Sequence, residues 1–138
     1  MADARTGARS VSSTVAAVFG AVFTLVGLAG FFVSETFAEQ DDNTLLGFEV
    51  NHLHNIVHLL IGVALLAASK RTDTARRLNL TIGATYVALA VLGPFINDTA
   101  LDVIALNTAD NWLHLFSGVL LVAVALGADK TARSRTTV

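Results

Sequence analysis

The chain has 138 residues, of which 54% are hydrophobic and only 14% are charged. Soluble domains usually carry about a quarter charged residues, so this composition excludes an ordinary soluble domain and indicates one small membrane-embedded domain. The net charge is −2, and the chain contains no cysteine, which excludes disulfides, thiolate metal sites and covalently attached haem.

Four apolar runs follow one another along the chain, at about residues 11–33, 51–69, 78–96 and 107–127. Each is near the length of about 20 residues that spans the hydrocarbon core of a bilayer. The first run is too long for the apolar core of a signal peptide, about 7–15 residues, so we interpret it as a retained helix. The sequence therefore predicts an all-α integral membrane four-helix bundle, with residues 1–138 as a single transmembrane domain.

Charged residues gather between these runs: residues 34–49 and 97–110 are acidic, and residues 70–77 are basic. All nine Lys and Arg residues lie in the basic segment or in the terminal segments, whereas eight of the eleven acids lie in the acidic segments. Because basic residues near helix ends stay in the cytoplasm, the sequence predicts a multi-pass protein with both termini cytoplasmic. At a membrane face, the partners that suit these basic residues are lipid headgroups, not nucleic acid.

A polar motif at the start of the second run returns 56 residues later, at the start of the fourth. Residues 51–63 and 107–119 share six identities in thirteen positions, including two asparagines, a histidine and a glycine. The first and third runs also match, at Gly20 with Gly83, Phe23 with Tyr86, and Gly30 with Gly93. The pattern predicts two tandem helical hairpins, about residues 11–69 and 78–127, related by a pseudo-twofold axis along the membrane normal.

The repeated polar residues are three or four positions apart, so each set shares one face of its helix. In lipid such a face must turn toward the bundle interior. We expect a structural polar cluster between the hairpins, formed by Asn51, Asn55, His58, Asn107, Asn111 and His114. Hydrogen bonding between helices, at about 0.6–2 kcal/mol per bond, is the simplest role for this cluster and needs no cofactor.

A haem or metal site is the alternative role for these histidines. His58 and His114 occupy equivalent places and could both bind a haem iron or a transition-metal ion, and His54, Asp110 and Glu49 could extend a metal site toward the acidic end. A proton or cation path is a third hypothesis, although no acidic residue or histidine continues it toward the basic end. Serines and threonines are not paired with a base, and there is no phosphate-binding glycine loop, so the sequence favours a protein that is not an enzyme.

Two segments carry a family resemblance: His54-Asn55-Ile56-Val57-His58-Leu59-Leu60-Ile61-Gly62 and Asn107-Thr108-Ala109-Asp110-Asn111-Trp112-Leu113-His114-Leu115. Over about residues 15–127 the chain resembles the domain of unknown function 4383 family, small bacterial membrane proteins of four predicted helices. The resemblance implies location in the bacterial plasma membrane. It implies no activity, ligand or catalytic residue.

The function that the sequence favours is that of a non-catalytic accessory or scaffolding subunit in a larger membrane assembly. Four helices leave much lateral surface, which lipid, other membrane subunits or a second copy of the chain would cover. The alternative is a haem- or metal-binding redox protein that uses His58 and His114.

Overall fold

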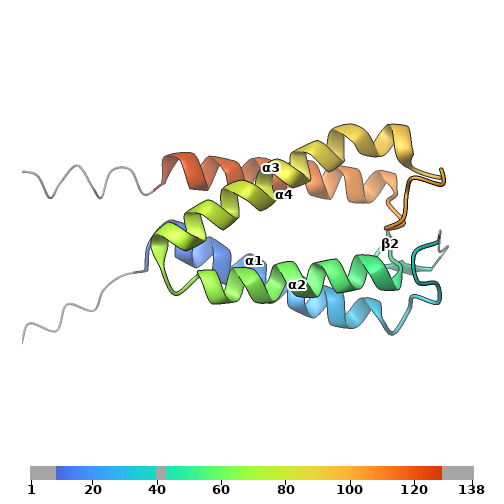
Figure 1. The fold of residues 1–138 in the computed structure, drawn as a ribbon, viewed down its shortest axis with the longest axis horizontal. Helices are drawn as coiled ribbons and strands as arrows, with labels where there is room; N and C mark the ends of the chain where they lie inside the picture. The colour runs from blue at the N-terminus through green and yellow to red at the C-terminus, as the bar shows by residue number, and fades with distance from the viewer. Residues whose placement is uncertain (1–8, 40–42, 129–138) are drawn as a thin grey trace, which may run out of the picture.

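The structure is a computed structural model that describes residues 9–39 and 43–128. Its four helices are α1 (Val11–Gly30), α2 (His52–Ala68), α3 (Thr72–Ile96) and α4 (Thr108–Gly127). The strands β1 (Thr44–Leu45) and β2 (Phe48–Glu49) pair antiparallel between α1 and α2. Figure 1 shows α1 with α2 as one hairpin and α3 with α4 as another, lying side by side. The predicted all-α four-helix bundle is confirmed.

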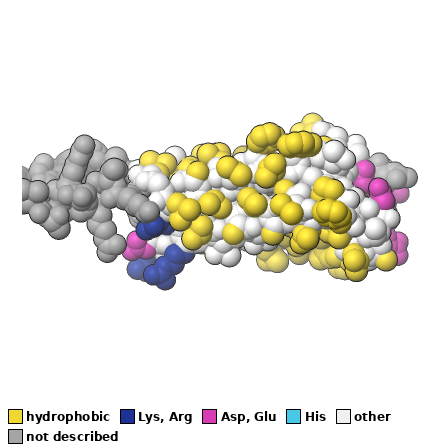
Figure 2. All heavy atoms as spheres, turned by 90° about the horizontal axis from the view of Figure 1, so that it is seen from above, with side chains coloured by type: hydrophobic (Ala, Val, Ile, Leu, Met, Phe, Trp, Pro, Cys, Tyr) yellow, Lys and Arg dark blue, Asp and Glu magenta, His cyan; other side chains and the backbone are white. Residues whose placement is uncertain are grey.

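Three of the four helices, α1, α3 and α4, are long and apolar enough to cross a membrane. The fourth, α2, has 17 residues and rises about 26 Å at 1.5 Å per residue, slightly less than a hydrocarbon core of about 30 Å. Figure 2 shows hydrophobic side chains along the middle of the visible face, Lys and Arg at one end and most of the Asp and Glu at the other. The fold is that of a membrane protein with a basic end and an acidic end.

The two polar motifs begin α2 and α4 as helix caps. Asn51 accepts a hydrogen bond from the backbone N–H of His54 at 2.9 Å, and Asn107 accepts one from that of Asp110 at 2.9 Å. Asp110 accepts in return from the Asn107 N–H at 3.2 Å, which completes a capping box. Both asparagines were expected inside their helices, but they immediately precede them.

Helix α3 begins at Thr72, six residues before the apolar run starts. Its first two turns carry charged residues. Their helix propensity is similar to that of apolar residues, but they give no hydropathy signal, so the apolar run begins later than the helix does. Asp73 in the first turn suits the positive end of the helix dipole. Pro94 lies in the last turn of α3, so the backbone bond that it removes is close to the helix end.

Within each hairpin the two helices meet at glycines. A Cβ atom on Gly20 would lie 2.9 Å from the Gly62 carbonyl oxygen, and one on Gly118 would lie 2.8 Å from the Gly83 carbonyl oxygen. Small residues allow membrane helices to approach this closely. We call α1 with α2 the first hairpin and α3 with α4 the second hairpin; contacts within each are far more extensive than contacts between them.

The two hairpins share an apolar core in the middle of the bundle, made of Ala16, Phe23, Leu65, Ala75, Ile82, Tyr86 and Leu121. Toward the basic end, the side-chain N–H of buried Asn79 donates to the Ser12 carbonyl oxygen at 3.0 Å, which links α3 to α1. The hairpins are therefore joined by apolar packing and by at least one polar contact outside the predicted motifs.

The acidic end is closed by the loops. Leu46 and Gly47, with φ of 57° and 91°, form the two-residue turn of the β1–β2 hairpin, where a left-handed backbone is needed. The Asn107 amide donates to the Gly47 carbonyl oxygen at 3.0 Å, and the Asn51 amide donates to that of Val103 at 2.9 Å. Each capping asparagine thus holds a loop of the other hairpin over the end of the bundle.

Candidate metal centre

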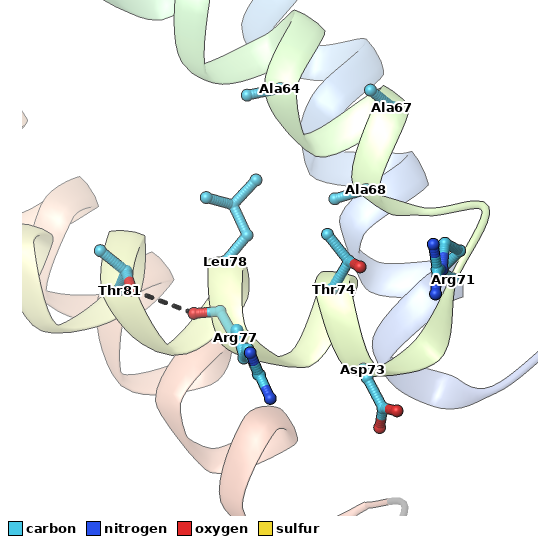
Figure 3. Close-up of a pocket in the computed structure, with 9 residues that line it drawn as sticks. All are labelled: Ala64, Ala67, Ala68, Arg71, Asp73, Thr74, Arg77, Leu78 and Thr81. Carbon is cyan, nitrogen blue, oxygen red and sulfur yellow. Dashed lines mark hydrogen bonds between the residues drawn. The ribbon is translucent and has the colours of Figure 1, made fainter.

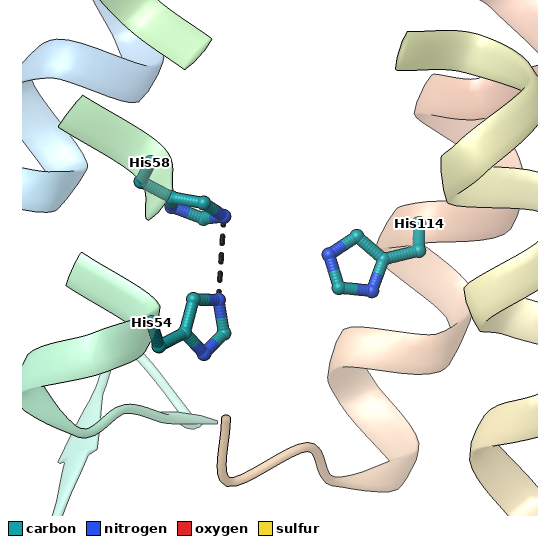
Figure 4. Close-up of side chains that lie close together, drawn as sticks. All are labelled: His54, His58 and His114. Carbon is teal, nitrogen blue, oxygen red and sulfur yellow. Dashed lines mark hydrogen bonds between the residues drawn. The ribbon is translucent and has the colours of Figure 1, made fainter. Parts of the chain in front are cut away.

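Three histidines converge between the hairpins, below the loops of the acidic end. His54 and His58 come from α2, and His114 comes from α4. Their rings turn toward one another (Figure 4), and each ring offers one nitrogen such that the three atoms lie within 4.8 Å of one another. All three side chains are buried. The centre is incomplete without both hairpins.

His54 has a fixed orientation and a defined tautomer. Its Nδ1 lies 2.8 Å from the Ile104 carbonyl oxygen, in the loop between α3 and α4. A carbonyl oxygen only accepts, so Nδ1 carries the hydrogen, and Nε2 of the neutral ring keeps its lone pair. That lone pair faces Nε2 of His58, which donates to it at 3.3 Å. A backbone carbonyl that holds one histidine nitrogen while the other points into a site is typical of metal-binding histidines.

His58 and His114 are held by aromatic rings instead. Phe23 stacks on His58 with ring centroids 5.3 Å apart, and Tyr86 meets His114 edge-on at 4.6 Å. The Nδ1 atoms of both histidines have no hydrogen-bond partner among the described residues, and neither has the buried Tyr86 hydroxyl. Most buried polar atoms in proteins are hydrogen-bonded, so these three require an explanation.

A cavity of about 70 Å³ lies beside His54 and His58, under the β1–β2 hairpin, and His114 is not among the residues that line it. Its walls include His54, His58 and Asp110 together with apolar residues of α1, α4 and the β1–β2 hairpin. This volume accommodates an ion with a few water molecules, since one water needs only about 10–15 Å³ by the same kind of measure. Asp110 is itself buried, so a carboxylate lines the route to the histidines.

The donors suit a first-row transition metal. Imidazole nitrogen binds Zn²⁺, Cu²⁺, Ni²⁺ and Fe²⁺, and Zn–N bonds of about 2.0–2.1 Å place tetrahedral ligands about 3.3–3.4 Å apart. The His54 and His58 Nε2 atoms are already 3.3 Å apart. His114, on the second hairpin, completes a set of three nitrogens, which is the number of protein ligands in catalytic zinc sites.

The other residues singled out from the sequence lie around this centre in different roles. Asn51 and Asn107 are the helix caps described above. Asn55 and Asn111 pack inside their own hairpins: their amide oxygens occupy the space that a Cβ of Gly30 or Gly93 would need. Hydrogen bonds between the hairpins from these two amides are absent among the described residues, so the expected polar cluster divides into caps, glycine contacts and the histidine centre.

Sequence reasoning did not identify several contacts of the site. The Ile104 carbonyl that orients His54 is a backbone atom in an irregular loop, and no residue type signals it. Tyr86 was matched with Phe23 in the repeat, but its position against His114 depends on how the hairpins meet. Asn79 could have been noticed as a lone amide in an apolar run.

A separate groove of about 610 Å³ lies at the basic end, between α2 and α3 (Figure 3). Ala64, Ala67 and Leu78 form its apolar side, and Arg71 and Arg77 lie at its mouth. No histidine lines it, so it has no part in the metal centre.

Comparison with known proteins identifies a family and adds no activity. The model of one family, described as "Domain of unknown function (DUF4383)", matches residues 13–127. No curated protein and no solved structure matches the chain. The matched region begins in α1 and ends with α4, so it contains both hairpins and all three histidines of the centre. The chain belongs to the domain of unknown function 4383 family.

Proposed function

We propose that this protein binds one divalent transition-metal ion in the membrane, through His54, His58 and His114. The observation that carries the proposal is the convergence of three buried imidazoles from two separate hairpins, with ligand atoms within 4.8 Å of one another. Zn²⁺ is the ion whose tetrahedral geometry agrees best with the 3.3 Å separation of the His54 and His58 nitrogens.

The hydrogen bonds of the cluster support this proposal. His54 has its Nδ1–H committed to the Ile104 carbonyl, and its Nε2 lone pair, which accepts from His58 Nε2 in the metal-free protein, points into the cluster. His58 can bind through Nε2 if its hydrogen moves to Nδ1, an atom with no other partner among the described residues. Three neutral imidazoles then bind the ion without net release of a proton, and nearby Asp110 offsets part of its charge.

An ion bound by all three histidines would join the two hairpins. Ligands of a tetrahedral Zn²⁺ lie about 3.3–3.4 Å apart, so nitrogens up to 4.8 Å apart must approach one another. Since His114 belongs to the second hairpin and the interface between hairpins is small, a slight closure of this interface supplies the movement. We expect the metal-bound protein to be more stable and more compact than the metal-free protein.

A single ion suits the site better than haem, the other cofactor considered for His58 and His114. Pockets for drug-sized ligands have volumes of about 300–1,000 Å³, whereas the cavity at the histidines is about 70 Å³.

Metal titration of the purified protein tests the proposal. Protein in detergent, stripped with a chelator, is titrated with Co²⁺, whose visible absorption reports tetrahedral coordination, and then with Zn²⁺ in competition. We expect one ion per chain by elemental analysis. At a free Zn²⁺ concentration of 100 times Kd, the gain in the free energy of unfolding would be about 2.7 kcal/mol.

Substitution of the histidines distinguishes this site from adventitious binding. His58→Gln and His114→Gln each remove one ligand, and we expect affinity to fall at least about tenfold in each. His52→Gln is the matched control, because His52 lies in the same helix but hydrogen-bonds Ser34 at 3.1 Å outside the cluster. Equal affinity in all three variants, or no binding by the unaltered protein, would overturn the proposal.

Three expectations from the sequence remain proposals beside this one. Matching contacts in the two hairpins, such as the glycine pairs, support their origin as copies of one unit. The distribution of Lys and Arg supports cytoplasmic termini in the bacterial plasma membrane. No contact in the structure points to an accessory or scaffolding role, because lipid alone would cover the exposed apolar side chains. Copurification of a stoichiometric partner would test that role.

A further inference from the structure

The β1–β2 hairpin lies between the cavity at the histidines and the surface of the acidic end. The cavity wall includes both buried histidines of α2 and four apolar residues of this segment: Leu45, Leu46, Phe48 and Val50. Leu46 is also 88% exposed, so at the turn a single residue separates the cavity from the surface. Each strand has only two residues, and two-stranded hairpins are marginally stable on their own. The β1–β2 hairpin is therefore a thin and weakly held cover over the cavity.

Contacts with the start of α4 keep the β1–β2 hairpin in place. At its turn, the side-chain N–H of Asn107 donates to the Gly47 carbonyl oxygen at 3.0 Å. At its base, the backbone N–H of Glu49 donates to the carboxylate of Asp110. The amide oxygen of Asn107 makes a separate contact, since it accepts from the Asp110 N–H at 2.9 Å and caps α4. A substitution at residue 107 can therefore release the turn and still begin the helix.

Toward the basic end, apolar packing closes the centre. Two helical turns beyond the last histidine of each helix, α2 and α4 carry Leu65 and Leu121, whose side chains have no exposed surface. In this half of the bundle α1, α2 and α4 contain no Asp, Glu or His, and α3 contains only Asp73 in its first turn. Burial of an ion without ligands is very costly, so we do not expect the metal to exchange through this half.

Carboxylates gather at the acidic end of the centre instead. Asp102 and Asp110 are both buried. Asp110 interacts electrostatically with Asp102 and with Glu49, and Asp102 interacts in the same way with His54. Negative charge around a cleft raises the local concentration of cations. The end that the β1–β2 hairpin covers is thus the end at which cations collect.

We propose that the β1–β2 hairpin is a lid through which the metal ion enters and leaves the centre at the acidic end. This inference rests on the proposed metal site and adds its route of exchange. When the turn leaves Asn107, an ion meets His54 and His58 first, because both line the cavity. His114, which does not line the cavity, binds last as the two helical hairpins close. The centre then gains and loses its ion on one side of the membrane, as a metal receptor does and a metal channel does not.

The rate of metal release tests this lid. Protein loaded with Co²⁺ in detergent is mixed rapidly with excess EDTA, and the loss of visible absorption gives the rate. Asn107→Ser removes the N–H that holds Gly47 and keeps a hydroxyl oxygen that can cap α4. Loss of one hydrogen bond should make opening about threefold to tenfold more frequent, so we expect release to be faster by this factor. Kd should stay within about twofold, because binding is accelerated equally.

Two further variants show where the ion passes. Asn79→Ser is the matched control, because it also removes an amide N–H that donates to a carbonyl oxygen of another helix at 3.0 Å, but at the basic end. It should release Co²⁺ at the rate of the unaltered protein. Asn107→Asp also keeps the cap and lacks the N–H, so it should release faster, as Asn107→Ser does.

The outcomes separate the lid from the metal site. Normal Co²⁺ affinity with unchanged release from the Asn107 variants, or equally fast release from Asn79→Ser, would overturn the lid and leave the metal site intact. Absence of Co²⁺ binding by the unaltered protein would overturn both proposals.

Discussion

The two hairpins make the same contacts with different chemistry around them. Both contain a close glycine pair, a glycine under an asparagine amide, and an aromatic ring against a histidine. The matching contacts are Gly20–Gly62 with Gly83–Gly118, Gly30–Asn55 with Gly93–Asn111, and Phe23–His58 with Tyr86–His114. These shared contacts form the scaffold of each hairpin, since they recur whether or not the neighbouring residues are the same.

The differences between the hairpins are at the positions that we assign to ligands. The place of His54 in the first hairpin is taken by Asp110 in the second, so the first supplies two imidazoles and the second supplies one imidazole and a carboxylate. The Asn55 amide donates to the Ser34 hydroxyl oxygen, whereas no such partner for the Asn111 amide is found among the described residues. A pair of hairpins with one scaffold can thus supply different side chains to one proposed metal centre, because a few positions diverge.

The largest effect expected in this comparison comes from the paired glycines. A Cβ on Gly62 would lie 2.6 Å from the Thr24 backbone nitrogen, and one on Gly118 would lie 2.8 Å from the Gly83 carbonyl oxygen. Because backbone must move in both cases, Gly62→Ala and Gly118→Ala should each lower the free energy of unfolding by about 1–3 kcal/mol. Thermal unfolding in detergent measures this.

The control for the glycine variants is Gly127→Ala, because a Cβ there would meet nothing within 4 Å. We expect that variant to match the unaltered protein. If only one of the Gly62 and Gly118 variants were destabilised, the close glycine pairs would not have the same role in the two hairpins.

An effect of similar size, but confined to one hairpin, is expected at the asparagines. Ser34→Ala leaves the buried Asn55 amide without its acceptor and should cost about 1–3 kcal/mol. Asn97 is at the corresponding end of α3, but its amide oxygen has no partner among the described residues. Asn97→Ala should therefore change stability by less than about 0.5 kcal/mol in lipid-free detergent. Chemical unfolding of both variants under the same conditions makes the comparison, and equal losses would contradict it.

The smallest effect is expected at Tyr86. Its hydroxyl is buried without a hydrogen-bond partner among the described residues, whereas the equivalent Phe23 has no hydroxyl. Tyr86→Phe makes the two hairpins alike at this position and should raise the unfolding free energy slightly, by about 0.5–1 kcal/mol. A clear loss of stability in the same assay would show that the hydroxyl has a partner in solution.

The sequence by itself determined the class of fold and the division of the chain. Runs of about 20 apolar residues have few stable forms other than membrane helices, because lipid cannot satisfy exposed backbone polar groups. The separation of basic and acidic segments marked the two ends of the bundle. The repeated motif predicted the two hairpins and singled out His58 and His114 as candidate ligands. All of these are local properties of composition and spacing.

Only the tertiary structure decided which of those polar residues meet. Spacing placed Asn51, Asn55 and His58 near one helix face, but one is a cap, one packs on a glycine and one faces His54. The site depends on the angle and depth at which two hairpins pack, and on a loop that brings the Ile104 carbonyl to His54. Every residue has the same backbone carbonyl group, so residue type cannot indicate which carbonyl will orient a histidine. Only the folded path of the chain decides that.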